Sequence, residues 1–370
     1  METRTLYTLR LWVILTISVV GFLLLIDALR PILLPFILGG IIAYLFDPLA
    51  DRLERAGLSR TAATVLIIVS FFALMTALVL SVGPMLVQQF ADLLRTLPAI
   101  FGKAQILIST YSAQLFTSLR ETSPVPLPED VSGLFAGFSA RAVQTVLNVL
   151  EGVAASSGAV FNLLSMLMIT PIVAFYFIRD WDHMVARVHT YIPRRFVPTV
   201  QAQFSAIDST LAAYLRGQIE VMCVLAVYYA IALSIIGVPY ALILALLSGL
   251  FIIIPYLGTL LSTGLAVGVA YLHFPELSPV WWTLGVYLAG QILESQILTP
   301  KLIGQSVGLH PLWVIFGLLA GGALLGFVGV LLALPITAVI GVVVGFWMQR
   351  YQQSSYYHAA PSAPPPTDAA

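Results

Sequence analysis

Apolar runs long enough to cross a lipid bilayer recur along this chain. A transmembrane helix needs about 20 consecutive, mostly apolar residues, and about eight segments meet or approach that length. They are residues 11–28, 33–46, 61–82, 153–178, 219–236, 240–271, 280–298 and 312–347. The pattern predicts an all-α polytopic membrane protein with about eight hydrophobic segments.

Two of these segments are interrupted and too long for a single crossing. The block 240–271 contains Pro255 and Gly258, and the block 312–347 contains several glycines and a proline. The interrupting residues of the second block are Gly321, Gly322, Gly326, Gly329 and Pro335. We expect each block to form a helical hairpin with an irregular tip, or two short half-helices. Backbone groups freed at the breaks must be satisfied by protein, water or solute, because lipid offers no partner.

Two further segments have an amphipathic pattern. Between residues 84 and 150, apolar side chains recur at three- and four-residue steps, which is a helical period. They are Leu86, Phe90, Leu93, Leu94 and Leu97, and prolines follow at 124, 126 and 128. We expect a helix, a turn and a helix outside the bilayer core. The second stripe comprises Phe204, Ile207, Leu211, Tyr214 and Leu215, and it predicts a helix pair that lies on the membrane surface or caps the bundle.

The alternation of these patterns divides the chain into six regions. They are N-terminal spans (1–83), an amphipathic extramembrane segment (84–152), one span (153–178), amphipathic cytoplasmic helices (179–218), a membrane core with both interrupted blocks (219–350) and a tail (351–370). The tail is rich in Gln, Ser, Ala and Pro, a composition typical of disorder.

The placement of arginine and lysine predicts the orientation. With the N-terminus in the cytoplasm, the basic clusters in 52–60 and 179–216 fall on the cytoplasmic side, as the positive-inside rule requires. The loop 273–279 has no Lys or Arg, as an outer loop should. No small-residue cleavage site follows the apolar run 11–26, so we expect an uncleaved first span. Both termini are therefore expected in the cytoplasm; the reverse topology would place the densest basic clusters outside.

Composition narrows the class further. The chain is 59% hydrophobic and 9% charged, whereas soluble domains carry about 25% charged residues. The zero formal net charge leaves no basic footprint for nucleic acid. The single Cys223 makes no intrachain disulfide and no metal cluster. The sequence has no Walker, HExxH or GxSxG motif, so we expect neither an enzyme nor a bound cofactor or metal.

Glu294 is the strongest single candidate for a functional residue. It follows about fourteen mostly apolar residues, and a charge at membrane depth costs about 2.5–3.5 kcal/mol unless it faces a cavity or a partner. It could bind and release a proton during a transport cycle. The alternative is that Glu294 sits at the interface and pairs with Lys301, in which case Pro300 must kink the chain.

The breaks and glycines also have two interpretations. The tip at Pro255 and Gly258 either contacts solute or is a plain turn between two helices. The glycines of the second block recur at a spacing of four, which allows close helix packing. A hairpin that slides needs the same close approach, so packing and function are compatible.

A series of motifs in order resembles the autoinducer-2 exporter family of bacterial membrane proteins. The matching stretches are 34–48, 179–182 (Arg-Asp-Trp-Asp), 214–218, 237–240, 254–258 (Ile-Pro-Tyr-Leu-Gly), 294–311 and 321–335. The resemblance implies an inner-membrane permease that moves small solutes, assembled as a homo-oligomer. The positions that carry over as candidates for the substrate path are Pro255, Gly258, Glu294, Pro300, Lys301, Gly304, Pro311, Gly321, Gly322, Gly326 and Gly329.

Three functional hypotheses remain open at this stage. The first is a secondary-type permease that exports small solutes, a quorum-sensing signal such as autoinducer-2 among them. The second is a sodium (cation)/proton antiporter. The third is a membrane scaffold or regulatory protein without flux. For the transporters we expect the two interrupted blocks to face each other, with their tips along the solute path and Glu294 as the protonatable group.

Overall fold

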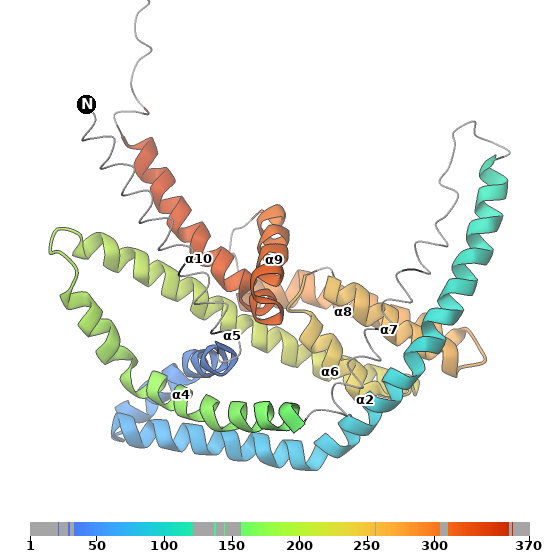
Figure 1. Ribbon diagram of the computed structural model, residues 1–370, viewed down its shortest axis with the longest axis horizontal. Coiled ribbons are helices and arrows are strands. Elements are labelled where there is room, and N and C mark those ends of the chain that lie inside the picture. Colours follow the sequence, from blue (N-terminus) through green and yellow to red (C-terminus); the bar gives the residue numbers. More distant parts are fainter. Residues whose placement is uncertain are drawn as a thin grey trace, which may run out of the picture. The chain divides into compact units, whose positions relative to one another are not determined.

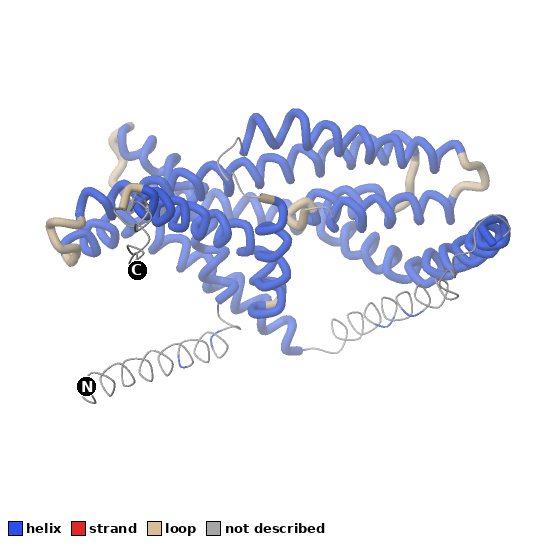
Figure 2. Tube along the Cα trace, turned by 90° about the horizontal axis from the view of Figure 1, so that it is seen from above, coloured by secondary structure: helices blue, strands red, loops and turns tan. Residues whose placement is uncertain are grey.

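A computed structural model describes residues 33–120, 157–255, 257–303 and 310–354, together with the isolated positions 21, 29, 137, 144 and 357. Every extended stretch of these residues is helix or a connecting turn, and none of the described residues forms a strand (Figures 1 and 2). The predicted all-α class is confirmed. Apart from position 21, the predicted first span lies outside the described residues, and so do the proline-rich turn at 124–128 and residues 355–356 and 358–370 of the tail.

The N-terminal half consists of long helices. A helix Leu33–Arg55 is followed by a turn in which Gly57 has φ +102°. Helix α2 then runs without interruption from Arg60 to Arg120, with Pro84 and Pro98 inside it. At 1.5 Å per residue, α2 is about 90 Å long, roughly three times the thickness of a bilayer core. Only part of α2 can therefore lie within the hydrocarbon.

Three of the predicted boundaries between apolar and amphipathic regions fall inside continuous helices. Helix α2 crosses the boundary at 83/84, α4 (Ser157–Thr190) crosses that at 178/179, and α5 (Val197–Ile236) crosses that at 218/219. These boundaries mark a change from apolar to amphipathic composition along a helix rather than a break in its backbone. The division into regions remains a prediction about which part of each helix lies in the bilayer.

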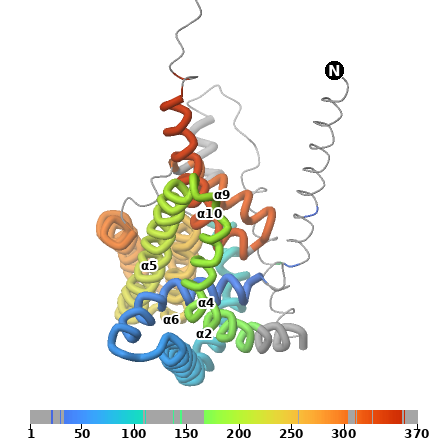
Figure 3. The backbone as a smooth tube through the Cα atoms, turned by 90° about the vertical axis from the view of Figure 1, so that its left-hand side faces the viewer, coloured from blue at the N-terminus to red at the C-terminus, as the bar shows by residue number. Residues whose placement is uncertain are grey.

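Both interrupted blocks are pairs of helices, as predicted. The first pair is α6 (Ala241–Phe251) and α7 (Leu257–His273). The second is α9 (Pro311–Leu325) and α10 (Phe327–Gln352), which lie side by side (Figures 1 and 3). Between the pairs come α8 (Ser278–Ile292) and the π-helix η1 (Leu293–Ile303).

Helix length distinguishes helices that can cross the membrane completely from helices that are too short to do so. Four helices among the described residues are long and apolar enough to cross a membrane: Leu33–Arg55, Arg60–Leu107, Val197–Ile236 and Val328–Gln352. Helix α6, with 11 residues, is only about 16 Å long. The apolar stretches of α7 and α9 are also below crossing length. The short arms fit hairpins that enter the bilayer partway.

The chain forms two compact units. The first comprises Met1–Trp181 with Gly217–Leu302, and the second comprises Asp182–Arg216 with Ile303–Ala370. The α6–α7 hairpin belongs to the first unit and the α9–α10 hairpin to the second. The two interrupted blocks are therefore structurally separate elements, and their facing each other remains a proposal.

Candidate functional site

Glu294 lies in an unusual stretch of backbone. Helix α8 continues directly into η1, an 11-residue π-helix that contains Glu294, Pro300 and Lys301. In an α-helix, Pro300 would leave the carbonyl of residue 296 without its donor and would clash with it. The wider turn of a π-helix relieves that clash. Because π-helical stretches are rare and frequently occur at functional sites, η1 strengthens the case for this segment.

The side chains of η1 differ in their surroundings. Glu294 is half-buried, whereas Lys301 and Pro300 are exposed. Among the described residues no ion pair joins Glu294 to Lys301. The structure therefore does not show the pair that a kink at Pro300 was expected to bring together. Gly304, seven residues before the start of α9, lies outside the described residues.

A cluster of tyrosines lies next to this segment. The rings of Tyr229 on α5 and Tyr287 on α8 are stacked, with their centroids 4.5 Å apart and their planes at 19°. The hydroxyls of Tyr287 and Ser248 on α6 share a hydrogen bond of 2.7 Å. The Tyr228 hydroxyl donates to the carbonyl of Val286 at 3.0 Å. Three helices are thus joined by polar contacts within an apolar interior.

Gly290 connects the tyrosine cluster to Glu294. A Cβ at Gly290 would lie 2.4 Å from the Tyr229 hydroxyl oxygen, so only glycine allows Tyr229 to pack here. Glu294 follows four residues later, and its carboxylate is close enough to interact electrostatically with the Tyr229 phenol. Tyr229 and Tyr287 are almost fully buried. The half-buried carboxylate therefore has a rigid, partly polar wall on one side.

The described residues at the tip of the first hairpin form backbone hydrogen bonds among themselves. The amides of Ile253 and Ile254 donate to carbonyls in the last turn of α6, and those of Leu257 and Gly258 donate to Pro255 and Ile254. A Cβ at Gly258 would lie 1.8 Å from the carbonyl oxygen of Phe251. Gly258 thus allows the two helices to meet, and the local geometry is that of a tight turn. Pro255 is half-buried in this turn.

Helix α2 holds the open end of the same hairpin. The residue before α6, Tyr240, has φ +60° and its side chain caps no helix amide. Instead, Gln89 of α2 accepts a hydrogen bond from the amide of Ile243, at 3.2 Å. At the far end of α7, the Lys103 ammonium lies 5.4 Å from the ring centroid of Tyr271. The hairpin is therefore positioned by side chains far away in the sequence.

The second hairpin turns at one glycine. Gly326 ends α9 and begins α10 with φ 61° and ψ −138°, a conformation that residues with a Cβ avoid. Gly321 and Gly329 face each other so closely that a Cβ on either would lie within 2.4 Å of the other's carbonyl oxygen. Gly322 has more room, with Val330 at 3.3 Å. The predicted break is thus Gly326 alone, and the neighbouring glycines pack the two helices together.

Pro311 begins α9. It occupies the first helical position, where the missing amide hydrogen has no intrahelical role. The preceding residue, His310, caps the helix, since its Nδ1 accepts a hydrogen bond from the Leu312 amide at 3.3 Å. The structure thus gives Pro311 a helix-initiating position. Of the candidate residues, Pro255, Gly258, Glu294, Pro300 and Lys301 lie in the first unit, and the described ones from Pro311 onward lie in the second.

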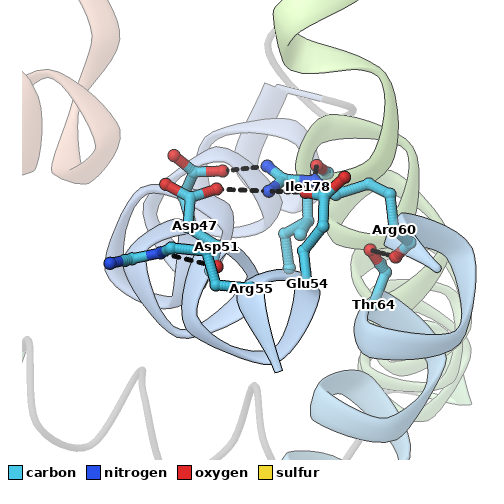
Figure 4. A network of polar contacts seen from close by, with 7 residues as sticks. All are labelled: Asp47, Asp51, Glu54, Arg55, Arg60, Thr64 and Ile178. Carbon is cyan, nitrogen blue, oxygen red and sulfur yellow. Dashed lines mark hydrogen bonds and ion pairs between the residues drawn. The ribbon is translucent and has the colours of Figure 1, made fainter. Parts of the chain in front are cut away.

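A second polar cluster lies at the start of α2. Arg60 pairs with Asp47, Asp51 and Glu54, all on the preceding helix (Figure 4). Its Nε donates to the carbonyl of Ile178 on α4, at 3.1 Å. One guanidinium therefore joins three helices. The carboxylates are spaced by four and three residues, which places them on one face of the helix. This spacing is the feature of the sequence that could have indicated the cluster.

Comparison with known proteins gives one consistent result. A profile described as "AI-2E family transporter" matches residues 12–349. The chain is 29% identical to "Putative transport protein YrrI" of Bacillus subtilis (strain 168), over 85% of this chain and 86% of that protein. It is 28% identical to "Putative permease PerM" of Escherichia coli (strain K12), over 90% of this chain and 92% of that protein. The similarity therefore extends through both units.

Proposed function

The chain belongs to the AI-2E transporter family, and from this premise we propose that it is a secondary-type permease that exports small solutes across the bacterial inner membrane. The multi-pass membrane character supports this role, because four described helices are long and apolar enough to cross a bilayer. We propose autoinducer-2, a quorum-sensing signal, as the first solute to test. Both termini are assigned to the cytoplasm, on the basis of the arginine clusters.

The single observation that carries the mechanism is Glu294 on η1. A half-buried carboxylate in a π-helical stretch of an apolar region, beside the tyrosine cluster, is an expensive arrangement to maintain in a membrane. In the proposed cycle, Glu294 takes up a proton on one side and releases it on the other as the solute moves. The hairpin tips at Pro255–Gly258 and at Gly326 are assigned to the walls of the solute path.

Cation/proton antiport is the second candidate, because a carboxylate that exchanges protons can also exchange them for Na⁺. The two functions can be distinguished in proteoliposomes that hold a pH gradient, which is followed with a pH-sensitive fluorescent dye. An antiporter dissipates the gradient when sodium is added outside. An exporter does so only when its solute is present.

The experiment that tests transport itself is a flux assay with the purified full-length chain in proteoliposomes. Labelled autoinducer-2 and a panel of small polar solutes are loaded inside, and their efflux is followed. Efflux above that of protein-free vesicles supports the permease. The absence of flux for every solute and for Na⁺ would favour the scaffold hypothesis, and such a scaffold would tolerate substitutions at 255–258 and 321–329.

A further inference from the structure

The end of α4 and its turn into α5 expose an apolar stripe. Met184, Val185, Val188 and Tyr191 are all exposed, with Val188 at 55% and Tyr191 at 80% of their full accessibility. The spacing of Met184, Val185 and Val188 places them on one face of α4, and Tyr191 follows directly after the end of the helix. Phe196 in the turn and Phe204 in α5 are exposed as well. All of these residues belong to the second unit.

The other face of the same helix end is polar. Asp182, His183, Arg187 and His189 alternate with the stripe and lie away from it. The turn adds Arg194 and Arg195, and the Arg195 guanidinium lies 4.4 Å from the ring centroid of Phe196. An exposed apolar stripe flanked by arginines and aromatic rings is the pattern of helices that lie in a bilayer interface.

Basic residues predominate in this segment. Residues 182–204 contain three arginines (187, 194 and 195) and one acidic residue, Asp182, in a chain whose formal net charge is zero. The segment is also tethered to the bilayer, because it continues directly from the apolar part of α4 and leads into the apolar part of α5. The segment therefore connects two stretches that are predicted to lie in the bilayer.

We propose that residues 182–204, the α4–α5 turn segment, bind anionic phospholipid headgroups. The stripe from Met184 to Tyr191 inserts at the boundary between headgroups and acyl chains, and Arg187, Arg194 and Arg195 bind the phosphates. Arginine suits this ligand because its planar fork donates two hydrogen bonds to one phosphate. Charge complementarity selects lipid over a protein partner, since a protein would have to supply a matching acidic surface next to the bilayer.

The first test maps which face of the helix touches lipid. In a Cys223→Ser background, the variants Val185→Cys and Ala186→Cys are labelled with the fluorophore NBD in the full-length chain. Position 185 lies in the stripe, whereas 186 is exposed on the opposite face. Each protein is placed in nanodiscs of phosphatidylcholine, with or without phosphatidylglycerol, that carry a shallow doxyl-labelled lipid. We expect blue-shifted, doxyl-quenched emission at 185, stronger with phosphatidylglycerol, and water-like emission at 186.

Two results would overturn the proposal. Water-like, unquenched emission at 185 would mean that the stripe faces solvent. Blue-shifted emission at 185 that lipid quenchers do not reach would mean that protein covers it. Since both labels occupy exposed positions, folding is checked by gel filtration of each labelled variant. The measurement needs no substrate, so it can succeed or fail independently of the transport proposal.

The second test concerns the headgroup. Arg194→Gln should raise the phosphatidylglycerol fraction needed for half-maximal quenching at 185 by roughly fivefold, the loss expected for one basic residue at an anionic surface. Arg95→Gln, an exposed arginine on α2, is the matched control and should leave that fraction unchanged. Two results would contradict a site for anionic headgroups. One is equal quenching of the label at 185 in neutral and anionic bilayers without either arginine substitution; the other is an equal change in the half-maximal fraction for Arg194→Gln and Arg95→Gln.

Discussion

Arg60 shows how one residue can organise several helices. Its guanidinium is 14% exposed and binds three carboxylates and a carbonyl from two other helices. Because the carboxylates are themselves a third or more exposed, part of each attraction is screened by solvent. Removing Arg60 nevertheless leaves Asp47 and Asp51 side by side without their common partner.

We therefore expect Arg60→Gln to lower the stability of the folded chain by about 2 kcal/mol, less than the 3–5 kcal/mol of a fully buried pair. The measurement is the thermal unfolding midpoint of the purified protein in detergent. Arg52→Gln, an exposed arginine on the same neighbouring helix, is the control and should change stability by no more than about 0.5 kcal/mol. Equal unfolding midpoints for the two variants would show that the ion pairs of Arg60 stabilise the fold no more than an ordinary surface ion pair does.

Gly290 gives a sharper test of the wall beside Glu294. Gly290→Ala must displace the Tyr229 ring, because the new methyl group would lie 2.4 Å from its hydroxyl oxygen. Overpacking of this kind costs about 1–3 kcal/mol and should reduce the rate of solute efflux. Gly285→Ala on the same helix meets no atom within 4 Å and should retain parental efflux. If both variants transport equally, the tyrosine cluster has no part in the solute path.

At the scale of elements, the α6–α7 hairpin depends on a cap supplied from α2. Gln89→Leu removes the acceptor for the Ile243 amide, and loss of a helix cap costs about 1 kcal/mol. Hydrogen exchange of the α6 amides should then be faster by roughly fivefold. Gln88→Leu changes the adjacent, exposed glutamine and should leave that exchange rate as it was. Unaltered exchange in Gln89→Leu would mean that packing alone positions α6.

Elements set by local chemistry were predictable from the sequence. The breaks around Pro255 and Gly326 follow from residues that cannot continue a helix or that alone adopt a positive φ. The continuity of α2 through Pro84 was not evident, because hydropathy changes there while the helix continues. The π-helix was not predicted, for a related reason. Pro300 indicates that a regular α-helix cannot continue unchanged, but either a kink or a wider π-helical turn relieves its steric clash.

Contacts between distant segments could not be predicted in this way. Tyr228 and the Val286 carbonyl that it binds are 58 residues apart, and Gln89 and Ile243 are 154 residues apart. Pairings of this kind depend on how α2, α5, α6 and α8 pack, which no local pattern encodes. Glu294 could be chosen as a candidate from the sequence, because a carboxylate directly after an apolar run is unusual in a membrane protein. The tyrosines beside it could not, because in sequence they resemble ordinary buried aromatic residues.

At the scale of the whole molecule, the candidate residues for the solute path are divided between the two compact units. Glu294 and the first hairpin belong to one unit, and the second hairpin belongs to the other. Movement between such units is the expected way for a permease to expose a site to each side in turn. The central claim is that protonation of Glu294 is coupled to this movement.

The most direct test is the pH dependence of solute efflux from proteoliposomes, for the parent chain and for Glu294→Gln. The substitution keeps the size of the side chain and removes its charge, so efflux should fall about tenfold, which corresponds to 1.4 kcal/mol, and lose its dependence on pH. Ser295→Ala, at the exposed neighbouring position, should keep both the rate and the pH profile. Unchanged efflux and an unchanged pH profile in Glu294→Gln would contradict the account.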